Sequence, residues 1–263
     1  MFSGMRFNSR YYPTYRPCDG VLKSWDAARI WTRAIVLTFV VIFISTPLCA
    51  LDPERDIRQY RRQRWTSDDG LVSSATMRVR QAADGYLWIG TRNGISRFDG
   101  IRFTNYLPGI TPGYTGVPIR WLLPAKDGSL WAATDTGASV FRNGQWTSYS
   151  EELGPLRSHV TALAEGRDGI WLGGRNGVGQ WRDGKFTPLP WFDDLPSITI
   201  HQLIEDRQGR LWIGALEGLL CVEDGKLRKV DVHANLDRGI SAVYEDKDGY
   251  IWIGGWDGLL ARG

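Results

Sequence analysis

The sequence predicts an all-β protein assembled from repeated four-stranded antiparallel sheets, on three observations. A tryptophan recurs about every forty residues, three glycine turns fall within each period, and the strand around the tryptophan is apolar at successive positions. Periods near forty occur both in β-propellers and in helical repeats, but glycine pairs this dense would break helices. We therefore expect a β-propeller with about four and a half to five blades, preceded by an N-terminal apolar helix.

Residues 34–51 form an 18-residue stretch without charge, with basic residues before it and Asp52 after it. This pattern is typical of a cleaved export signal. It also fits an uncleaved anchor, because 18 residues nearly span a bilayer. Both interpretations predict an exported, periplasmic protein, tethered to the inner membrane if the stretch is retained. We expect residues 1–33 to be a disordered cytoplasmic leader and residues 52–61 a linker.

Charge and cysteine content narrow the possible partners. Residues 1–50 hold six basic and two acidic groups, which leaves 26 basic and 27 acidic groups, a net charge of −1, for residues 51–263. A chain of this charge gives no reason to expect nucleic acid. Of the three cysteines, only Cys221 falls in the predicted propeller, so no disulfide or cysteine metal site is expected within it.

Five units align along residues 62–263, the predicted propeller. Their tryptophans, spaced by 43, 40, 41 and 40 residues, are Trp88, Trp131, Trp171, Trp212 and Trp252. We expect the blades near residues 72–106, 117–149, 158–189, 198–230 and 239–263. The tryptophans form the structural core of the repeat, because a strand that is apolar at successive positions is covered on both faces.

Each unit has the turn chemistry of a four-stranded meander. In the first unit Asp84-Gly85 precedes the tryptophan strand, Asn93-Gly94 follows it, and Asp99-Gly100 ends the third strand. Asp-Gly suits a two-residue hairpin turn with positive φ. Two positions after each tryptophan the residue is small, which lets neighbouring backbones approach where blades converge. These positions are Gly90, Ala133, Gly173, Gly214 and Gly254.

The last unit ends after its third strand, which leaves two interpretations. Arg62–Trp65 looks like an outermost strand and could complete the fifth blade, closing a small ring. Alternatively, the chain is an N-terminal fragment of a longer protein, which we favour.

The motif at Asp84–Gly100, DGYLWIGTRNGISRFDG, resembles the two-component regulator propeller repeat, and the other four units are similar, with Ala132-Ala133 and Gln208 as departures. The resemblance implies an extracytoplasmic sensor of a bacterial signal-transduction receptor. It also implies downstream receptor domains as partners: a β-sandwich, a transmembrane helix, and a histidine kinase or diguanylate cyclase output, none of which is present in this sequence.

Ligand contacts are expected on the face that carries the Gly94-type turns and the connections between blades, because binding residues concentrate on loops held by a rigid scaffold. Arginine and asparagine beside aromatic residues would suit an unknown small molecule or carbohydrate. Any one of these residues is equally explained as a solvated turn residue, with Asn93 and Asn176 present for positive φ. The ligand-binding candidates are Arg92, Asn93, Asp135, Arg175, Asn176, Glu217, Trp256 and Asp257, with Tyr114, His159, Trp191, Phe192 and His201 on the connections.

The sequence offers little for catalysis. The three histidines, His159, His201 and His233, have no metal-ligand spacing, and no nucleophile elbow or paired-carboxylate motif stands out. We expect no enzyme activity, no cofactor and no metal in this chain. Two alternatives remain: a free-standing exported binding or scaffold propeller, and an exported propeller lyase or glycosidase, although the tryptophan placement of streptogramin lyases is not seen.

Overall fold

The chain separates into two units, Met1–Arg62 and Gln63–Gly263. The computed structural model describes residues 62–190, 198–232, 239–255 and 260–262, together with Asp56. The apolar stretch at 34–51 and its predicted helix therefore lie outside the described residues. Among the residues that are described, no helix is long and apolar enough to cross a membrane.

The second unit contains five antiparallel sheets, each formed by strands consecutive in sequence. The first comprises β1 (Thr76–Gln81), β2 (Leu87–Thr91), β3 (Ile95–Phe98) and β4 (Phe103–Tyr106). The second comprises β5 (Ile119–Pro124), β6 (Leu130–Thr134), β7 (Gly137–Arg142) and β8 (Gln145–Tyr149). The third comprises β9 (Val160–Glu165), β10 (Ile170–Gly174), β11 (Gly177–Arg182) and β12 (Lys185–Pro188).

The fourth sheet comprises β13 (Ile200–Glu205), β14 (Leu211–Ala215), β15 (Gly218–Glu223) and β16 (Lys226–Val230). The fifth has three described strands, β17 (Ile240–Glu245), β18 (Ile251–Gly255) and β19 (Leu260–Arg262). A 3₁₀ helix, Glu151–Leu156, lies between the second and third sheets in sequence. The predicted four-stranded antiparallel blades are confirmed.

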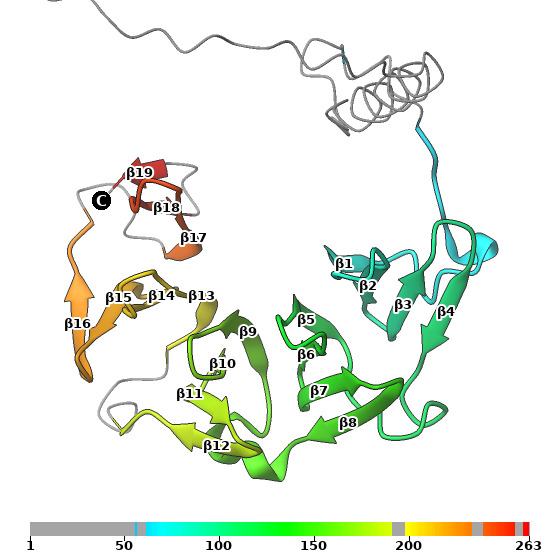
Figure 1. Ribbon diagram of the computed structural model, residues 1–263, viewed down its shortest axis with the longest axis horizontal. Helices are drawn as coiled ribbons and strands as arrows, with labels where there is room; N and C mark the ends of the chain where they lie inside the picture. Colours follow the sequence, from blue (N-terminus) through cyan, green and yellow to red (C-terminus); the bar gives the residue numbers. More distant parts are fainter. Residues whose placement is uncertain (1–55, 57–61, 191–197, 233–238, 256–259, 263) are drawn as a thin grey trace, which may run out of the picture. The chain divides into compact units, whose positions relative to one another are not determined.

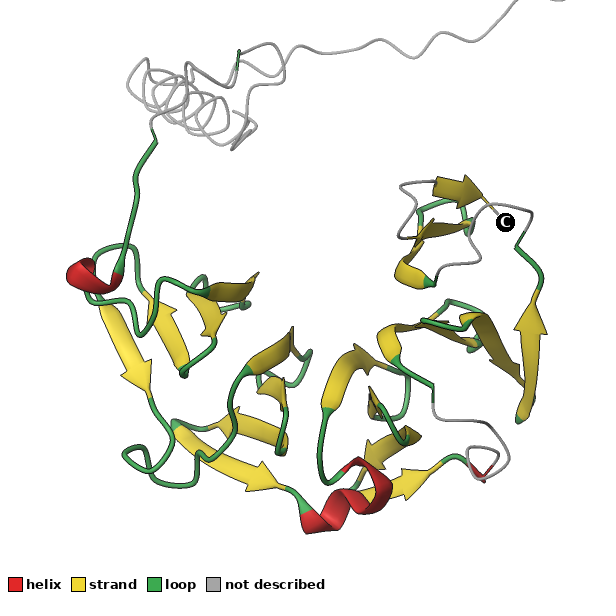
Figure 2. Cartoon of the chain, turned by 180° about the vertical axis from the view of Figure 1, so that it is seen from behind, coloured by secondary structure: helices red, strands yellow, loops and turns green. Residues whose placement is uncertain are grey.

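Within this unit the blades follow one another about a common centre, with the first strand of each blade innermost (Figures 1 and 2). Each innermost strand contacts the innermost strand of the next blade: β1 meets β5, β5 meets β9, β9 meets β13, and β13 meets β17. Residues about forty apart in sequence therefore become neighbours at the centre.

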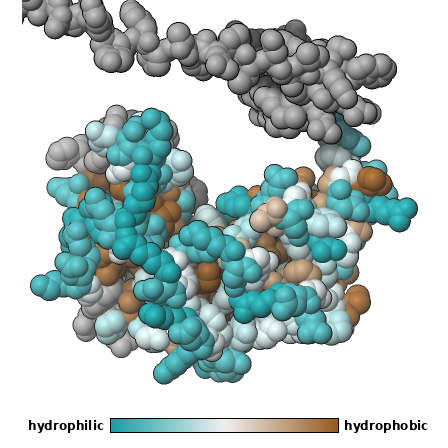
Figure 3. Space-filling model, viewed as in Figure 1, coloured by the Kyte–Doolittle hydropathy of each residue, from teal (hydrophilic) through white to brown (hydrophobic). Residues whose placement is uncertain are grey.

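The core lies between consecutive blades, where the faces of two sheets pack together. Trp88 and Leu122 belong to one such cluster, between the first and second blades. Trp212 and Val243 belong to another, between the fourth and fifth. Figure 3 shows the result on one face of the unit, where hydrophobic residues are visible between hydrophilic ones. Of the repeat tryptophans, Trp88, Trp131 and Trp212 are buried, whereas Trp171 and Trp252 are half-buried.

The small residues after each tryptophan accommodate the next blade. A Cβ added to Gly90 would lie 2.5 Å from Cγ2 of Ile119 on β5, and one added to Gly173 would lie 2.9 Å from Leu203 on β13. The approaching group is thus mainly a side chain of the innermost strand, not the neighbouring backbone that we expected. A methylene at these positions would displace that side chain.

The turns differ in part from the sequence expectation. The turn after the third strand has positive φ at both central residues in three blades, as at Asn143 and Gly144. The turn before the tryptophan strand holds three residues in four blades, as in the first, where Ala82 N–H donates to Tyr86 O and only Gly85 has positive φ. In the third blade it holds two residues, since Gly166 N–H donates to Gly169 O. Asp84 contributes through its side chain instead, since its Oδ1 accepts a hydrogen bond from Tyr86 N–H at 3.1 Å.

Arg62–Trp65 does not form a strand of the fifth sheet. The Trp65 ring lies 5.0 Å from the Phe98 ring of β3, in an edge-on arrangement. Trp65 therefore contacts the first blade, and the ring closure considered from the sequence is not present in the described residues.

Candidate functional site

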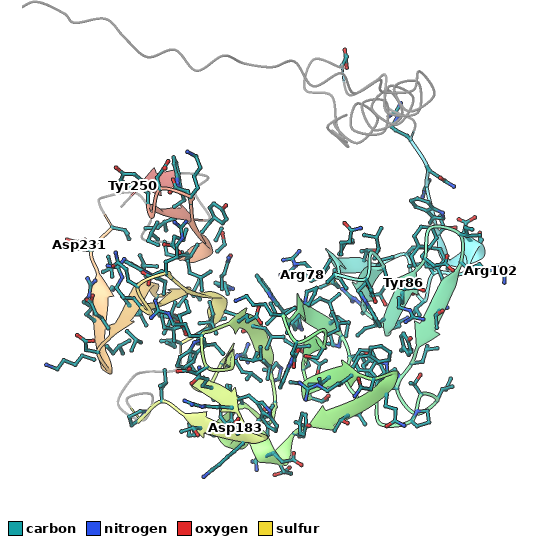
Figure 4. All side chains as sticks on the ribbon, in the orientation of Figure 1. Arg78, Tyr86, Arg102, Asp183, Asp231 and Tyr250 are labelled. Atoms are coloured by element: carbon teal, nitrogen blue, oxygen red, sulfur yellow. The ribbon has the colours of Figure 1, made fainter. Side chains whose placement is uncertain are left out.

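A cavity of about 290 Å³ opens where the innermost strands of four blades meet the turns and connections above them. Its wall holds a concentration of positive charge with a single carboxylate. The charged and titratable lining residues are Arg78, Arg120, Asp135, His159, Arg175 and His201. Figure 4 labels Arg78, on the side of the first sheet nearest to β5.

A β-bulge in each of three innermost strands places one side chain of that strand in the cavity wall. In β5 the register shifts between Ile119 and Trp121, in β9 opposite Gly173 and Gly174, and in β13 between Ile200 and Gln202. The residues at these bulges are Arg120, Thr161 and His201, and all three line the cavity. Bulges commonly redirect one side chain at the edge of a sheet beside a functional site. Here the same irregularity, repeated in successive blades, brings three side chains to one place.

Asp135 is neutralised by Arg120 in a two-pronged ion pair. Arg120 Nε donates to Oδ1 at 2.6 Å, and the second guanidinium nitrogen donates to Oδ2 at 2.7 Å. The hydrogen bonds from Arg120 lower the pKa of Asp135, so the carboxylate is ionised at neutral pH. The Asp135 carbonyl also accepts from His159 N–H at 3.1 Å, which ties the β6–β7 turn to the next connection.

Two further guanidiniums, of Arg78 and Arg175, form no ion pair or hydrogen bond with a carboxylate of the described residues, although the charge of Arg175 also lowers the pKa of Asp135. The half-buried Arg78 donates to the carbonyl of its neighbour Met77 at 2.9 Å and lies over the Trp121 ring at 5.2 Å. Burial lowers the pKa of Arg78, and the nearby charges of Arg80 and Arg120 lower it further. Arg175 lies on the exposed β10–β11 turn, and no described side chain pairs with its guanidinium.

His201 is a half-buried histidine in the cavity wall. Burial lowers its pKa below the usual 6.5, and the nearby Glu217 opposes this only in part. The imidazole is therefore mostly neutral at pH 7. His159, the other cavity histidine, sits at a positive φ of 63° on the connection that enters β9.

The sequence-predicted residues divide between the cavity and elsewhere. Asp135, Arg175, His159 and His201 come together in the cavity wall. Glu217 is exposed beside it and accepts from Thr199 N–H at 3.2 Å. Trp256, Asp257, Trp191 and Phe192 lie outside the described residues.

The other candidates lie away from this cavity. Arg92 and Asn93 are exposed on the corresponding turn of the first blade, and Asn176 borders a separate cavity of about 110 Å³. Neither asparagine has positive φ, so that explanation for their presence is wrong. Tyr114 is buried against Trp146, with 4.8 Å between the rings, and belongs to the core.

Sequence reasoning missed Arg78, Arg120 and Thr161, because it searched the turns and not the innermost strands. One signal was present: a polar residue follows the apolar residue that begins the innermost strand, as in Ile119-Arg120, Val160-Thr161 and Ile200-His201. The bulge changes the direction of the side chain at this second position. The alternation of side chains along a regular strand does not predict that change.

A second cavity, of about 350 Å³, lies between the second and third blades at the edge that carries the Asp-Gly turns. Its charged groups are largely paired with each other: Arg142 with Asp127 at 2.5 Å and Arg182 with Asp168 at 3.7 Å. We favour the cavity of about 290 Å³ as the candidate site, because two of its three guanidiniums have no carboxylate partner among the described residues. Across the described ranges, no group of three His, Cys, Asp or Glu side chains could hold a metal ion.

Comparison with known protein families finds a match to two segments of the chain. Residues 194–216 and 236–257, in the fourth and fifth units, match the family described as two component regulator propeller. These two segments are similar to two-component regulator propeller repeats. None of the curated proteins compared with it matches significantly.

Solved structures similar to this chain include extracellular domains of bacterial receptors. The extracellular domain described as that of a hybrid two-component system from B. thetaiotaomicron is 26% identical, with a TM-score of 0.64, over 76% of this chain and 30% of its own. The extracellular domain of a one-component system from the same organism is 22% identical, with a TM-score of 0.58, over 72% and 28%. The present chain thus spans less than a third of these proteins.

The propeller fold is shared more widely. Virginiamycin B lyase from Staphylococcus aureus has a TM-score of 0.58 at 16% identity, over 72% of this chain and 70% of its own. At that identity the likeness shows the fold alone.

Proposed function

We propose that this propeller is the extracytoplasmic sensor module of a bacterial signal-transduction receptor, of the two-component or cyclic-di-GMP class. The observation that carries the proposal is the match of the repeat together with 26% identity to the extracellular domain of a hybrid two-component system over 76% of this chain. Export is supported by the basic leader and the apolar stretch at 34–51.

The cavity at the innermost strands is the place where this module would receive its signal. It lies on a rigid scaffold of paired strands, and side chains from four blades converge on it. The proposal assigns no catalysis to this chain. Output, by a histidine kinase or a diguanylate cyclase, belongs to partner domains of the receptor.

The location is tested by cysteine labelling in intact cells. Ile110→Cys is introduced into a chain in which Cys18 and Cys49 are replaced by alanine, because Ile110 is 76% exposed. We expect a membrane-impermeant maleimide to label it in intact cells as fully as after lysis. The matched control is the same chain without Ile110→Cys, whose remaining Cys221 is buried and stays unlabelled. Labelling only after lysis would contradict an extracytoplasmic position.

The signalling role is tested in the parent bacterium. Deletion of the gene should change either a phosphorylation-dependent transcriptional response or the level of cyclic-di-GMP, and a plasmid copy should restore it. If both quantities stay unchanged across growth conditions, the free-standing scaffold becomes the better account.

A further inference from the structure

The cavity at the innermost strands has an uncompensated positive charge. Three guanidiniums, from Arg78, Arg120 and Arg175, face it, and Asp135 is the one carboxylate among the described lining residues. Leaving the histidines aside, the three arginines and the one aspartate give the lining two net positive charges. Because Arg120 already engages both oxygens of Asp135, the excess resides on Arg78 and Arg175.

These two guanidiniums are available for a ligand. Arg175 forms no hydrogen bond or ion pair with any described residue, and Arg78 uses one nitrogen on the carbonyl of Met77. Arginine presents several N–H donors in a fixed planar fork, which matches the paired oxygens of a carboxylate, sulfate or phosphate. A half-buried arginine without a counter-ion is costly, and an anion would relieve that cost.

We propose that the cavity binds a small ligand with two negative charges, held through carboxylate, sulfate or phosphate oxygens by Arg78 and Arg175. Arg120, whose guanidinium is held by Asp135, forms part of the cavity wall together with Arg78 and Arg175. The volume of about 290 Å³ suits a small molecule or a terminal group, not a macromolecule. The inference deepens the proposed function, since it names the chemistry of the signal that the sensor would receive.

The charge pattern disfavours other ligand classes. A cation would be repelled by the two excess charges at short range. A neutral ligand that excluded water would leave both guanidiniums unpaired, at a cost that an anion avoids. Since Arg78 lies on the first blade and Arg175 on the third, the bound anion would also join non-adjacent blades.

The test uses the purified full chain and isothermal titration calorimetry at constant ionic strength. Sulfate, hydrogen phosphate and succinate are titrated separately, to distinguish the three oxyanion sources, with chloride and acetate as monovalent controls. We expect saturable binding for at least one divalent anion and none for the monovalent ones. Arg175→Gln and Arg78→Gln should each weaken that binding about tenfold or more, because each removes a charged hydrogen-bond donor pair.

Arg92→Gln is the matched control, because Arg92 occupies the corresponding Arg-Asn-Gly turn of the first blade and does not line the cavity. It removes the same charge and should leave the affinity unchanged. Equal weakening by Arg92→Gln and Arg175→Gln, or no divalent binding by the wild-type chain, would overturn the proposal. Failure here with export and signalling intact would reject only the ligand class, whereas failure of export would reject the sensor function itself.

Discussion

Asp206 is a buried carboxylate that secures the turn before the Trp212 strand. Its Oδ2 accepts from Trp212 Nε1–H at 2.8 Å and from Arg210 Nε at 2.6 Å, while its Oδ1 accepts from the amides of Gln208 and Arg210. Asp246 accepts from Trp252 Nε1–H at 2.7 Å in the same manner in the fifth blade. A carboxylate thus anchors the repeat tryptophan to its own turn.

Replacement of Asp206 should destabilise the fold. Asp206→Asn removes the negative charge that strengthens four hydrogen bonds. Its amide group would also point N–H donors at the donors of Trp212 or Arg210. We therefore expect a loss of about 2–3 kcal/mol in the free energy of unfolding. Urea titration followed by tryptophan fluorescence measures it. Asp168→Asn, in the exposed turn of the third blade, is the control and should cost less than about 0.5 kcal/mol. Equal effects would contradict the anchoring role.

The same substitution should alter the acid response. Burial would raise the pKa of Asp206, but the hydrogen bonds from Trp212 and Arg210 outweigh it and hold the pKa below its usual value. Its stabilising contribution is therefore complete above about pH 4 and is lost as pH falls through the folded-state pKa. Asp206→Asn should accordingly flatten the loss of stability below pH 4.

At this scale the sequence indicates some residues and hides others. Burial of Trp88, Trp131 and Trp212 follows from apolar residues at successive positions. Asp206 could not be distinguished, because the corresponding residues of the first three units are Ala82, Ala125 and Gly166, and no repeated pattern marks it.

At the scale of the element, the tryptophan strands can be placed from sequence because glycine pairs bound them on both sides. Their bulged neighbours cannot. The shift between Ile119 and Trp121 turns Arg120 into the cavity, whereas regular alternation would assign it otherwise. The local twist that produces the bulge depends on packing between blades, which no short motif records.

Alanine in place of the glycine two positions after the tryptophan should destabilise some blades more than others. A Cβ on Gly90 would lie 2.5 Å from Ile119, whereas one on Gly214 would lie 3.1 Å from Ile240 and Val243. We expect Gly90→Ala to lose about 1–3 kcal/mol of unfolding free energy and Gly214→Ala distinctly less. Both have backbone conformations open to alanine, and Ala133 occupies the same place naturally. The reverse order in urea midpoints would contradict the packing described.

At the scale of the whole propeller unit, one contact recurs between blades. The glutamate that ends an innermost strand accepts from the backbone amide that follows the innermost strand of the preceding blade. The pairs are Lys126 with Glu165 at 2.8 Å, Arg167 with Glu205 at 3.0 Å, and Arg207 with Glu245 at 3.0 Å. The contact is missing between the first blade and the second, because Pro124 stands where the glutamate would be at the end of β5.

The outer faces of the first and fifth blades differ from the faces between blades. Val79 is 46% exposed, although its counterparts Leu122, Leu163, Leu203 and Val243 are at most 1% exposed. Tyr244 on β17 is 65% exposed. Among the described residues, only the second, third and fourth blades have a neighbouring blade on both faces. The sequence predicts that the blades stack, but it does not predict which outer faces stay exposed.

Units forty residues apart stack as adjacent blades, and the cavity and its proposed ligand depend on this stacking. A double-mutant cycle tests it through Trp171 of the third blade, whose Nε1–H donates to Glu205 of the fourth at 2.6 Å. With Trp171→Phe, Glu205→Ala and the double variant compared by urea unfolding, we predict a coupling free energy of about 1–2 kcal/mol. Additivity within about 0.3 kcal/mol would show that the two residues do not meet, and would contradict the stacked arrangement.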